Sequence, residues 1–189
     1  MKKVSKAQPI TRDNFIITIF GDAGVGKTTL AMGFPKPILF DFDEGIHRAE
    51  QSVRCDHYKM KKYDDFHEYI MGPSSSQEIE SEGYKTIIVD TAGTMLDDYM
   101  SLYVQGLNRY NKRANGLSQQ GWGVMKVMFA QLRARARQLK VDFVFLCHDK
   151  NEGDEIVRKV PEISGGSAAI LRRASDLSLI HISEPTRPR

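Results

Sequence analysis

Cysteine and extended apolar stretches are scarce in this 189-residue sequence. Its two cysteines, Cys55 and Cys147, show neither the spacing nor the accompanying histidines of a metal site. No apolar stretch approaches the roughly 20 residues that a membrane-spanning helix needs, and residues 1–6 do not contain the apolar core of a signal peptide. These absences argue against a membrane partner. They predict a cytoplasmic, reduced setting in which Cys147 packs as a small hydrophobic side chain.

Neither charge sign is in large excess, because 27 lysines and arginines face 24 aspartates and glutamates for a net charge of +3. The hydrophobic share of 41% and the length fit one ordinary globular domain with a sizeable core. The basic residues nevertheless gather in three clusters, which are either nucleic-acid contacts or solvated helix faces. The clusters are Arg109, Lys112 and Arg113; Arg133, Arg135, Arg137 and Lys140; and Arg172 with Arg173.

A complete phosphate-binding P-loop lies near the N-terminus. Residues 21–29 read GDAGVGKTT, which matches GxxxxGK[ST], between an apolar strand-like run at 15–20 and a helix-prone stretch. Glycines let successive backbone N–H groups curl around an anion, and the start of the helix adds its dipole. The sequence therefore predicts that a nucleoside triphosphate binds here. The predicted contact residues are Gly21, Asp22, Ala23, Gly24, Val25, Gly26, Lys27, Thr28 and Thr29.

Three side chains suit the chemistry of a Mg²⁺–nucleotide site. Lys27 can reach the β- and γ-phosphates, and the Thr28 hydroxyl can take one coordination place on Mg²⁺. The apolar run 87–89 ends in Asp90, at the carboxyl end of a predicted parallel strand that neighbours the P-loop. We therefore expect Thr28 and Asp90 to hold the metal ion.

Hydrolysis also needs a group that positions or deprotonates the attacking water. Glu44 is the first candidate, because it follows the tip of the strand expected at 38–42 and leads into a glycine turn, and Asp43 is its rival. His148 ends the strand expected at 141–147, where a polar side chain could contact the γ-phosphate and report its loss. The predicted catalytic residues are Glu44, Lys27 and His148.

Apolar strand-like runs alternate with helix-like patterns along the chain. Such alternation predicts an α/β fold with a mostly parallel sheet and helices on both faces. A surface loop is expected at 73–76, which combines proline with three serines. Strands are expected at 15–20, 38–42, 52–55, 84–90 and 141–147, helices at 28–32, 65–71, 95–112 and 121–139, and a charged hairpin around 151–154.

The C-terminal residues differ in origin from the rest of the chain. Residues 177–187 read LSLIHISEPTR, which matches the in-frame translation of a transposase-type sequencing adapter. We therefore predict a non-native tail, a native C-terminus cut near Asp176 and a sheet truncated at that end. The alternative is a genuine last strand, since 177–182 has apolar β-branched character. The predicted domains are an N-terminal extension at 1–12, a core at 13–176 and the tail at 177–189.

The order of these motifs resembles the RecA-like ATPase core, most closely the short phage-type proteins of the AAA-family ATP-binding kind. The resemblance rests on GDAGVGKTT, an acidic strand tip ending in Asp-Glu-Gly, IIVD and FVFLCH, and it covers residues 13–176. It implies a P-loop ATPase that uses ATP and Mg²⁺, with Glu44 as the catalytic glutamate and His148 as a sensor. It also implies DNA-binding loops at 108–118 and 164–166. A role on single-stranded DNA in phage recombination or replication follows, in a bacterial cytoplasm and as a homo-oligomer.

Other nucleotide-binding classes remain open from the residues alone. Residues 90–93 fit the DxxG pattern of a GTPase and 149–152 is a near miss to its guanine-reading motif, but 91–140 shows no strand between two helices. A nucleotide-binding DNA module with little hydrolysis would be favoured if Glu44 faces away from the phosphates. A small-molecule kinase would need an arginine-rich lid that is not visible, and a partitioning ATPase would have lysine in place of Asp22.

Overall fold

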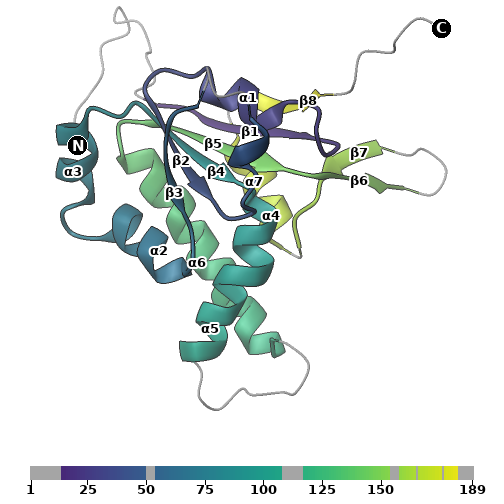
Figure 1. The fold of residues 1–189 in the computed structure, drawn as a ribbon. Coiled ribbons are helices and arrows are strands. Elements are labelled where there is room, and N and C mark those ends of the chain that lie inside the picture. The colour runs from purple at the N-terminus through teal and green to yellow at the C-terminus, as the bar shows by residue number, and fades with distance from the viewer. Residues whose placement is uncertain are drawn as a thin grey trace, which may run out of the picture.

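A parallel β-sheet forms the centre of the protein (Figure 1). The computed structural model describes residues 14–49, 54–107, 117–153, 158–164, 166–175 and 177–182. The strands are β1 (Ile16–Gly21), β2 (Pro37–Asp41), β3 (Asp56–Lys59), β4 (Thr86–Asp90), β5 (Asp142–Cys147) and β8 (Leu177–Ile182). They lie in the order β3-β2-β4-β5-β1-β8, and every neighbouring pair is parallel. The predicted α/β fold with a parallel sheet is confirmed.

Helices pack on both faces of this sheet and leave a buried core on each side. One core contains Ala31 and Met32 of the first helix, and the other is covered by the helices that follow β3 and β4. The helices are α1 (Lys27–Met32), α2 (Tyr63–Met71), α3 (Ser75–Glu82), α4 (Ala92–Thr94), α5 (Ser101–Leu107), α6 (Gln119–Gln138) and α7 (Ser167–Ala174), with a π-helical segment at Met95–Met100. Within the described parts of the chain, no helix is both long and apolar enough to cross a membrane.

The continuous apolar runs become the central strands because both faces of those strands are covered. Every residue of β1 and of β4 is buried, as expected for a parallel sheet between helical layers. Cys147, at the end of β5, is fully buried in the core, as predicted. At the far edge of the sheet, all four residues of β3 are exposed.

Several local elements differ from the sequence expectation. Helix α3 occupies part of the loop expected at 73–76; it is polar and buries only Ser75 and Ile79, so its helical pattern is weak in the sequence. Strand β3 lies at Asp56–Lys59 instead of 52–55, and residues 50–53 lie outside the described part. The expected hairpin exists as β6 (Asp149–Glu152) paired antiparallel with β7 (Arg158–Pro161).

Residues 177–182, which belong to the predicted non-native tail, form the strand β8 beside β1. Parallel pairing runs from Ile17 opposite Leu177 to Gly21 opposite Ile182, with a register shift between them. The structure thus places residues 177–182 in the sheet, as the alternative of a genuine last strand expects. The adapter origin is a hypothesis about the nucleotide sequence and stays a prediction, and residues 1–13 and 183–189 lie outside the described part.

A buried asparagine joins the start of β1 to the end of α6. The Asn14 side-chain amide donates hydrogen bonds to the backbone carbonyls of Ala136, Leu139 and Val141, and its residue is only 6% exposed. We expect Asn14→Ala to lower the free energy of unfolding by about 2–3 kcal/mol, because buried carbonyls lose their partner. Urea denaturation measures the free energy of unfolding. Asn151→Ala, on an exposed position of β6, serves as the matched control and should change it by less than about 0.5 kcal/mol.

Candidate nucleotide-binding site

The P-loop spans residues 21–29 between β1 and α1. Gly24 (φ +82°) and Gly26 (φ +92°) lie in the left-handed region, which only glycine enters without strain. A side chain at either position would meet no atom within 4 Å, so the loop is open on its outer side. The sequence-predicted loop is therefore formed as a curved turn that leads directly into a helix.

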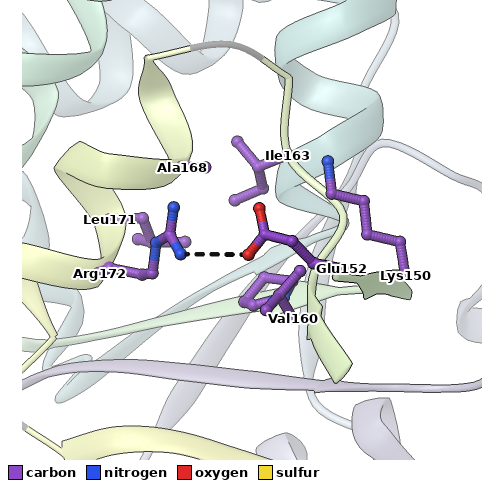
Figure 2. Close-up of a pocket in the computed structure, with 8 residues that line it drawn as sticks. Lys150, Glu152, Val160, Ile163, Ala168, Leu171 and Arg172 are labelled. Carbon is purple, nitrogen blue, oxygen red and sulfur yellow. Dashed lines mark ion pairs between the residues drawn. The ribbon is translucent and has the colours of Figure 1, made fainter. Parts of the chain in front are cut away.

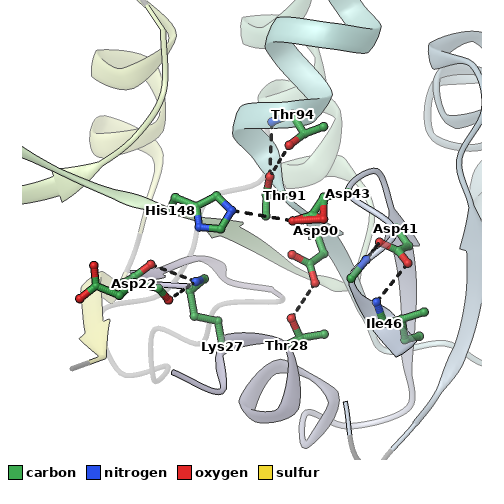
Figure 3. A network of polar contacts seen from close by, with 12 residues as sticks. Asp22, Lys27, Thr28, Asp41, Asp43, Ile46, Asp90, Thr91, Thr94 and His148 are labelled. Carbon is green, nitrogen blue, oxygen red and sulfur yellow. Dashed lines mark hydrogen bonds and ion pairs between the residues drawn. The ribbon is translucent and has the colours of Figure 1, made fainter. Parts of the chain in front are cut away.

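The Lys27 side chain is buried in this loop. Its ammonium donates hydrogen bonds to the backbone carbonyls of Gly21 (2.9 Å) and Asp22 (2.7 Å), and the residue is 6% exposed (Figure 3). Burial lowers the pKa of Lys27, and the neighbouring Asp90 carboxylate acts in the opposite direction. The Lys27 ammonium can therefore donate to phosphate oxygens in place of these two backbone carbonyls.

Thr28, in α1, and Asp90, at the end of β4, lie in contact. The Thr28 hydroxyl donates to an Asp90 carboxylate oxygen at 2.7 Å (Figure 3). The motif order predicts that the strand of Asp90 neighbours the P-loop strand, but β5 lies between β1 and β4. Burial raises the pKa of Asp90 to about 6, with the nearby carboxylates of Asp43 and Asp41 adding to the effect and the Thr28 hydrogen bond opposing it.

These oxygens fit a Mg²⁺ ion held together with a nucleotide. A hydroxyl and a carboxylate are hard oxygen donors, and Mg²⁺ usually takes one or two protein ligands plus phosphates and waters. Across the described residues, no group of three or more histidine, cysteine, aspartate or glutamate side chains could hold a metal ion by itself. The donor set of Thr28 and Asp90 thus suits a metal that arrives with the phosphates, and not an all-protein cage.

Three acidic residues lie at the end of β2 or just after it, and their side chains have different partners. The Asp41 carboxylate accepts hydrogen bonds from the backbone N–H groups of Gly45 (3.0 Å) and Ile46 (3.2 Å), so it holds the turn together. Asp43 lines the cavity that Lys27, Thr28 and Asp90 also line. Its side chain is 17% exposed, and its buried Oδ1 has no hydrogen-bond partner among the described residues.

Glu44 points away from the phosphate-binding cavity. Its carboxylate pairs with Lys59 at 3.0 Å, its side chain is 62% exposed, and it is absent from the described residues that line the cavity. The backbone at Glu44 is left-handed (φ +54°), which turns this side chain outward while Asp43 faces in. The sequence favours Glu44 over Asp43, but in the structure Asp43 lines the cavity and Glu44 does not.

His148 follows β5 and lines the same cavity as Asp43. Its Nε2 lies 3.8 Å from an Asp43 carboxylate oxygen, and its side chain is 36% exposed (Figure 3). The His148 backbone carbonyl accepts a hydrogen bond from the N–H of Glu162 at 2.8 Å, which ties the end of β5 to the segment after β7. His148 thus lines the cavity and is joined through its backbone carbonyl to Glu162, two residues before the loop expected to bind DNA.

Only part of the two predicted DNA-binding loops is described. Residues 108–116 and Gly165 lie outside the described part, and so does the cluster of Arg109, Lys112 and Arg113. Of the second loop, the Ser164 hydroxyl donates to an Asp97 carboxylate oxygen at 2.8 Å, and Gly166 is exposed. Arg135 belongs to the other predicted basic cluster but donates hydrogen bonds to Ile70 and Ser76, which is a packing role.

The residues of the near-miss guanine motif have other partners. Asp149 pairs with Lys159 at 2.5 Å, and Glu152 pairs with Arg172 at 3.7 Å in a pocket between the hairpin and α7 (Figure 2). Among the described residues of 91–140, every regular element is helical, so the strand that a Ras-like GTPase requires is not seen there. Both observations count against the GTPase interpretation.

Two basic residues at the site were not selected from the sequence. Arg48, in a short 3₁₀ turn, lines the cavity, and Lys159 on β7 pairs with Asp22 of the P-loop at 3.1 Å. Lys159 and Asp22 are 137 positions apart in the chain, so only the folded hairpin reveals their contact.

Comparison with known proteins agrees with this architecture. A sequence profile described as AAA domain matches residues 13–185. Among solved structures, the KaiC-like protein PH0186 from the hyperthermophilic archaeon Pyrococcus horikoshii OT3 is similar in fold, with a TM-score of 0.52 and 10% identity over 91% of this chain and 73% of that one. At this identity the similarity shows the fold alone, an α/β arrangement of the KaiC-like type. No curated protein matches the sequence significantly.

Proposed function

This chain belongs to the AAA domain family, and from that premise we propose that it binds ATP with Mg²⁺ and hydrolyses the nucleotide. The observation that supports this most strongly is the contact between Thr28 and Asp90. It brings a hydroxyl and a buried carboxylate together across 62 residues of sequence, in the cavity that Lys27 also lines. An arrangement of a P-loop, a buried lysine and a Thr–Asp pair is what phosphoryl transfer from a Mg²⁺-bound nucleotide needs.

Each residue of the cavity has a distinct part in this proposal. The P-loop N–H groups and Lys27 bind the phosphate oxygens, while Thr28 and Asp90 would hold Mg²⁺. Bound Mg²⁺ supplies positive charge that offsets the charge on the phosphates. His148, which contacts the cavity and whose carbonyl bonds to Glu162, would relay the presence of the γ-phosphate to the loop at 164–166.

We assign the positioning of the attacking water to Asp43 in place of Glu44. Asp43 lines the cavity with an unpartnered buried carboxylate oxygen, as seen within the described residues. A water molecule is a natural partner for such an oxygen, because a buried acceptor without one costs free energy. The ion pair of Glu44 with Lys59 also supports this assignment, because it holds the Glu44 carboxylate outside the cavity.

Steady-state hydrolysis by the full chain tests the proposed function. ATP and GTP are compared with Mg²⁺ and with EDTA, after nucleotide binding has been checked by calorimetry. We expect ATP turnover that requires Mg²⁺ and exceeds GTP turnover. A folded protein that binds ATP but does not turn it over would favour a nucleotide-binding module with little hydrolysis, and preference for GTP would favour a switch protein.

We further propose that ATP turnover is coupled to single-stranded DNA, in phage recombination or replication and within a homo-oligomer. Two contacts support a route from the nucleotide to the loop at 164–166: His148 bonds to Glu162, and Ser164 bonds to Asp97 in the helical segment after Asp90. Helix α7 follows this loop and ends with two exposed arginines, which supply positive charge for a phosphate backbone.

Binding of a fluorescent single-stranded oligonucleotide at increasing salt tests the DNA proposal. We expect log affinity to fall linearly with log salt, and Arg173→Ala to reduce the slope by about 0.7, the contribution of one phosphate contact on a single strand. The control is Lys85→Ala, since this exposed lysine lies just before β4, at the opposite end of the strands. Binding that does not respond to salt, or no binding at all, would rule out the proposal.

A further inference from the structure

The second residue of the P-loop is acidic, which is unfavourable for a loop that binds anions. Asp22 has a side chain that is 64% exposed, and Lys27 donates to its backbone carbonyl at 2.7 Å. A carboxylate on the phosphate-binding loop lowers the positive potential that attracts an anion there, and this weakens binding unless a cation compensates. Nucleotide binding therefore favours a cation close to the Asp22 carboxylate.

Lys159 lies in the position that such a cation requires. Its ammonium contacts the Asp22 carboxylate at 3.1 Å and the Asp149 carboxylate at 2.5 Å. The Asp149 side chain is 4% exposed, so this second contact is shielded from solvent and salt. Lys159 is thus held between a buried carboxylate of the hairpin and the exposed carboxylate of the P-loop.

The hairpin fixes where this ammonium can be. In the antiparallel register, Asn151 pairs with Lys159 and Asp149 pairs with Pro161, so Asp149 and Lys159 are diagonal neighbours with side chains on one face. The next residue after β7 is Glu162, whose N–H bonds to the His148 carbonyl at 2.8 Å. The hairpin is therefore anchored at the nucleotide site at two points, one at Asp22 and one at His148.

We propose that Lys159 is a positioning residue for the nucleotide, which neutralises Asp22 and holds the outer segment of the P-loop against the β6–β7 hairpin. It acts through Asp22 and does not touch the phosphates. A segment more than a hundred residues from the P-loop motif thus contributes to ATP affinity. The inference rests on the proposed binding of ATP and adds a determinant that the motif does not contain.

Rescue of one substitution by another distinguishes charge neutralisation from a merely structural role. We expect Lys159→Met to weaken ATP binding by about tenfold, the order of one uncompensated charge close to a partly screened site. The double variant Asp22→Asn/Lys159→Met should recover to within about threefold of the unmodified protein, since residue 22 then carries no charge that Lys159 has to neutralise. Asp22→Asn alone should bind at least as well as the unmodified protein, and Lys159→Arg should retain binding.

Isothermal titration calorimetry with ATP and Mg²⁺ on the full chain measures these affinities, with thermal melts to confirm folding. Lys150→Met is the matched control, because Lys150 is an exposed lysine of the same hairpin beside Glu152 (Figure 2). If Lys159→Met does not fold, Lys159→Gln gives the same comparison, since glutamine keeps a hydrogen-bond donor but not the charge.

The outcomes separate the inference from the proposed function. An unmodified protein that binds no ATP overturns both. If it binds ATP, the inference alone is overturned when Lys159→Met binds equally well, or when the double variant binds as weakly as Lys159→Met. Weak binding by the single variant with recovery in the double variant supports the neutralisation of Asp22.

Discussion

Lys27→Ala is expected to reduce ATP affinity by at least about a hundredfold and to bring turnover to the background level. The Lys27 ammonium is the buried cation of the P-loop, with two carbonyls of that loop as its present partners. Hydrogen bonds between a charged donor and a phosphate are the strong ones, and here they would form in a partly desolvated setting. Calorimetry gives the affinity and phosphate release gives the turnover.

The same substitution should not greatly destabilise the unliganded fold. Because burial lowers the pKa of Lys27 in the folded protein, the charged form is less favourable there than in the unfolded chain at neutral pH. Removing the charge therefore removes an electrostatic cost, which offsets part of the loss of the hydrogen bonds to the Gly21 and Asp22 carbonyls, and alanine is compatible with the first turn of α1. A thermal melt of Lys27→Ala close to that of Lys61→Ala, which replaces an exposed lysine, would show that lost binding is not lost folding. ATP binding of normal strength by Lys27→Ala would contradict the assignment of this loop.

Local sequence patterns were sufficient for the parts of the site that are contiguous in the chain. The P-loop could be predicted because its strand, glycines and helix follow one another within about twenty residues, and each has its own backbone signature. Asp90 could be predicted because an apolar run that ends in an acidic residue places it at the carboxyl end of a strand. That β5 lies between β1 and β4 could not be predicted, since strand order depends on packing between distant segments.

The sequence could not predict which of the neighbouring residues Asp43 and Glu44 points into the cavity. Asp43 and Glu44 follow the same strand tip, but in the folded turn, where the backbone is left-handed at Glu44, Asp43 lines the cavity and Glu44 pairs with Lys59 outside it. A positive φ at a residue other than glycine is uncommon and has no clear signature in the side-chain sequence. Likewise, the polar helix α3 buries only two residues, and too little periodicity remains to predict it.

Asp43→Asn is expected to lower ATP turnover by about a hundredfold or more while ATP affinity changes by less than about threefold. An amide keeps the size of the side chain but cannot accept a proton from water, and general-base assistance contributes a factor of this order. The Asp43 carboxylate lies in the cavity near His148, so its loss should affect the chemical step and leave the P-loop contacts intact. Single-turnover hydrolysis with saturating enzyme separates that step from binding and product release.

Glu44→Gln is the matched control, because it makes the same chemical change one residue away. Its carboxylate is 62% exposed and pairs with Lys59 outside the cavity, so we expect turnover within about threefold of the unmodified protein. The two variants together decide between neighbouring residues that the sequence alone does not separate. If Glu44→Gln abolishes turnover and Asp43→Asn does not, the base is Glu44, and the turn after β2 must reverse its direction when nucleotide binds. If neither variant loses turnover, the attacking water is positioned by a group outside this turn, and His148→Gln becomes the substitution to measure next.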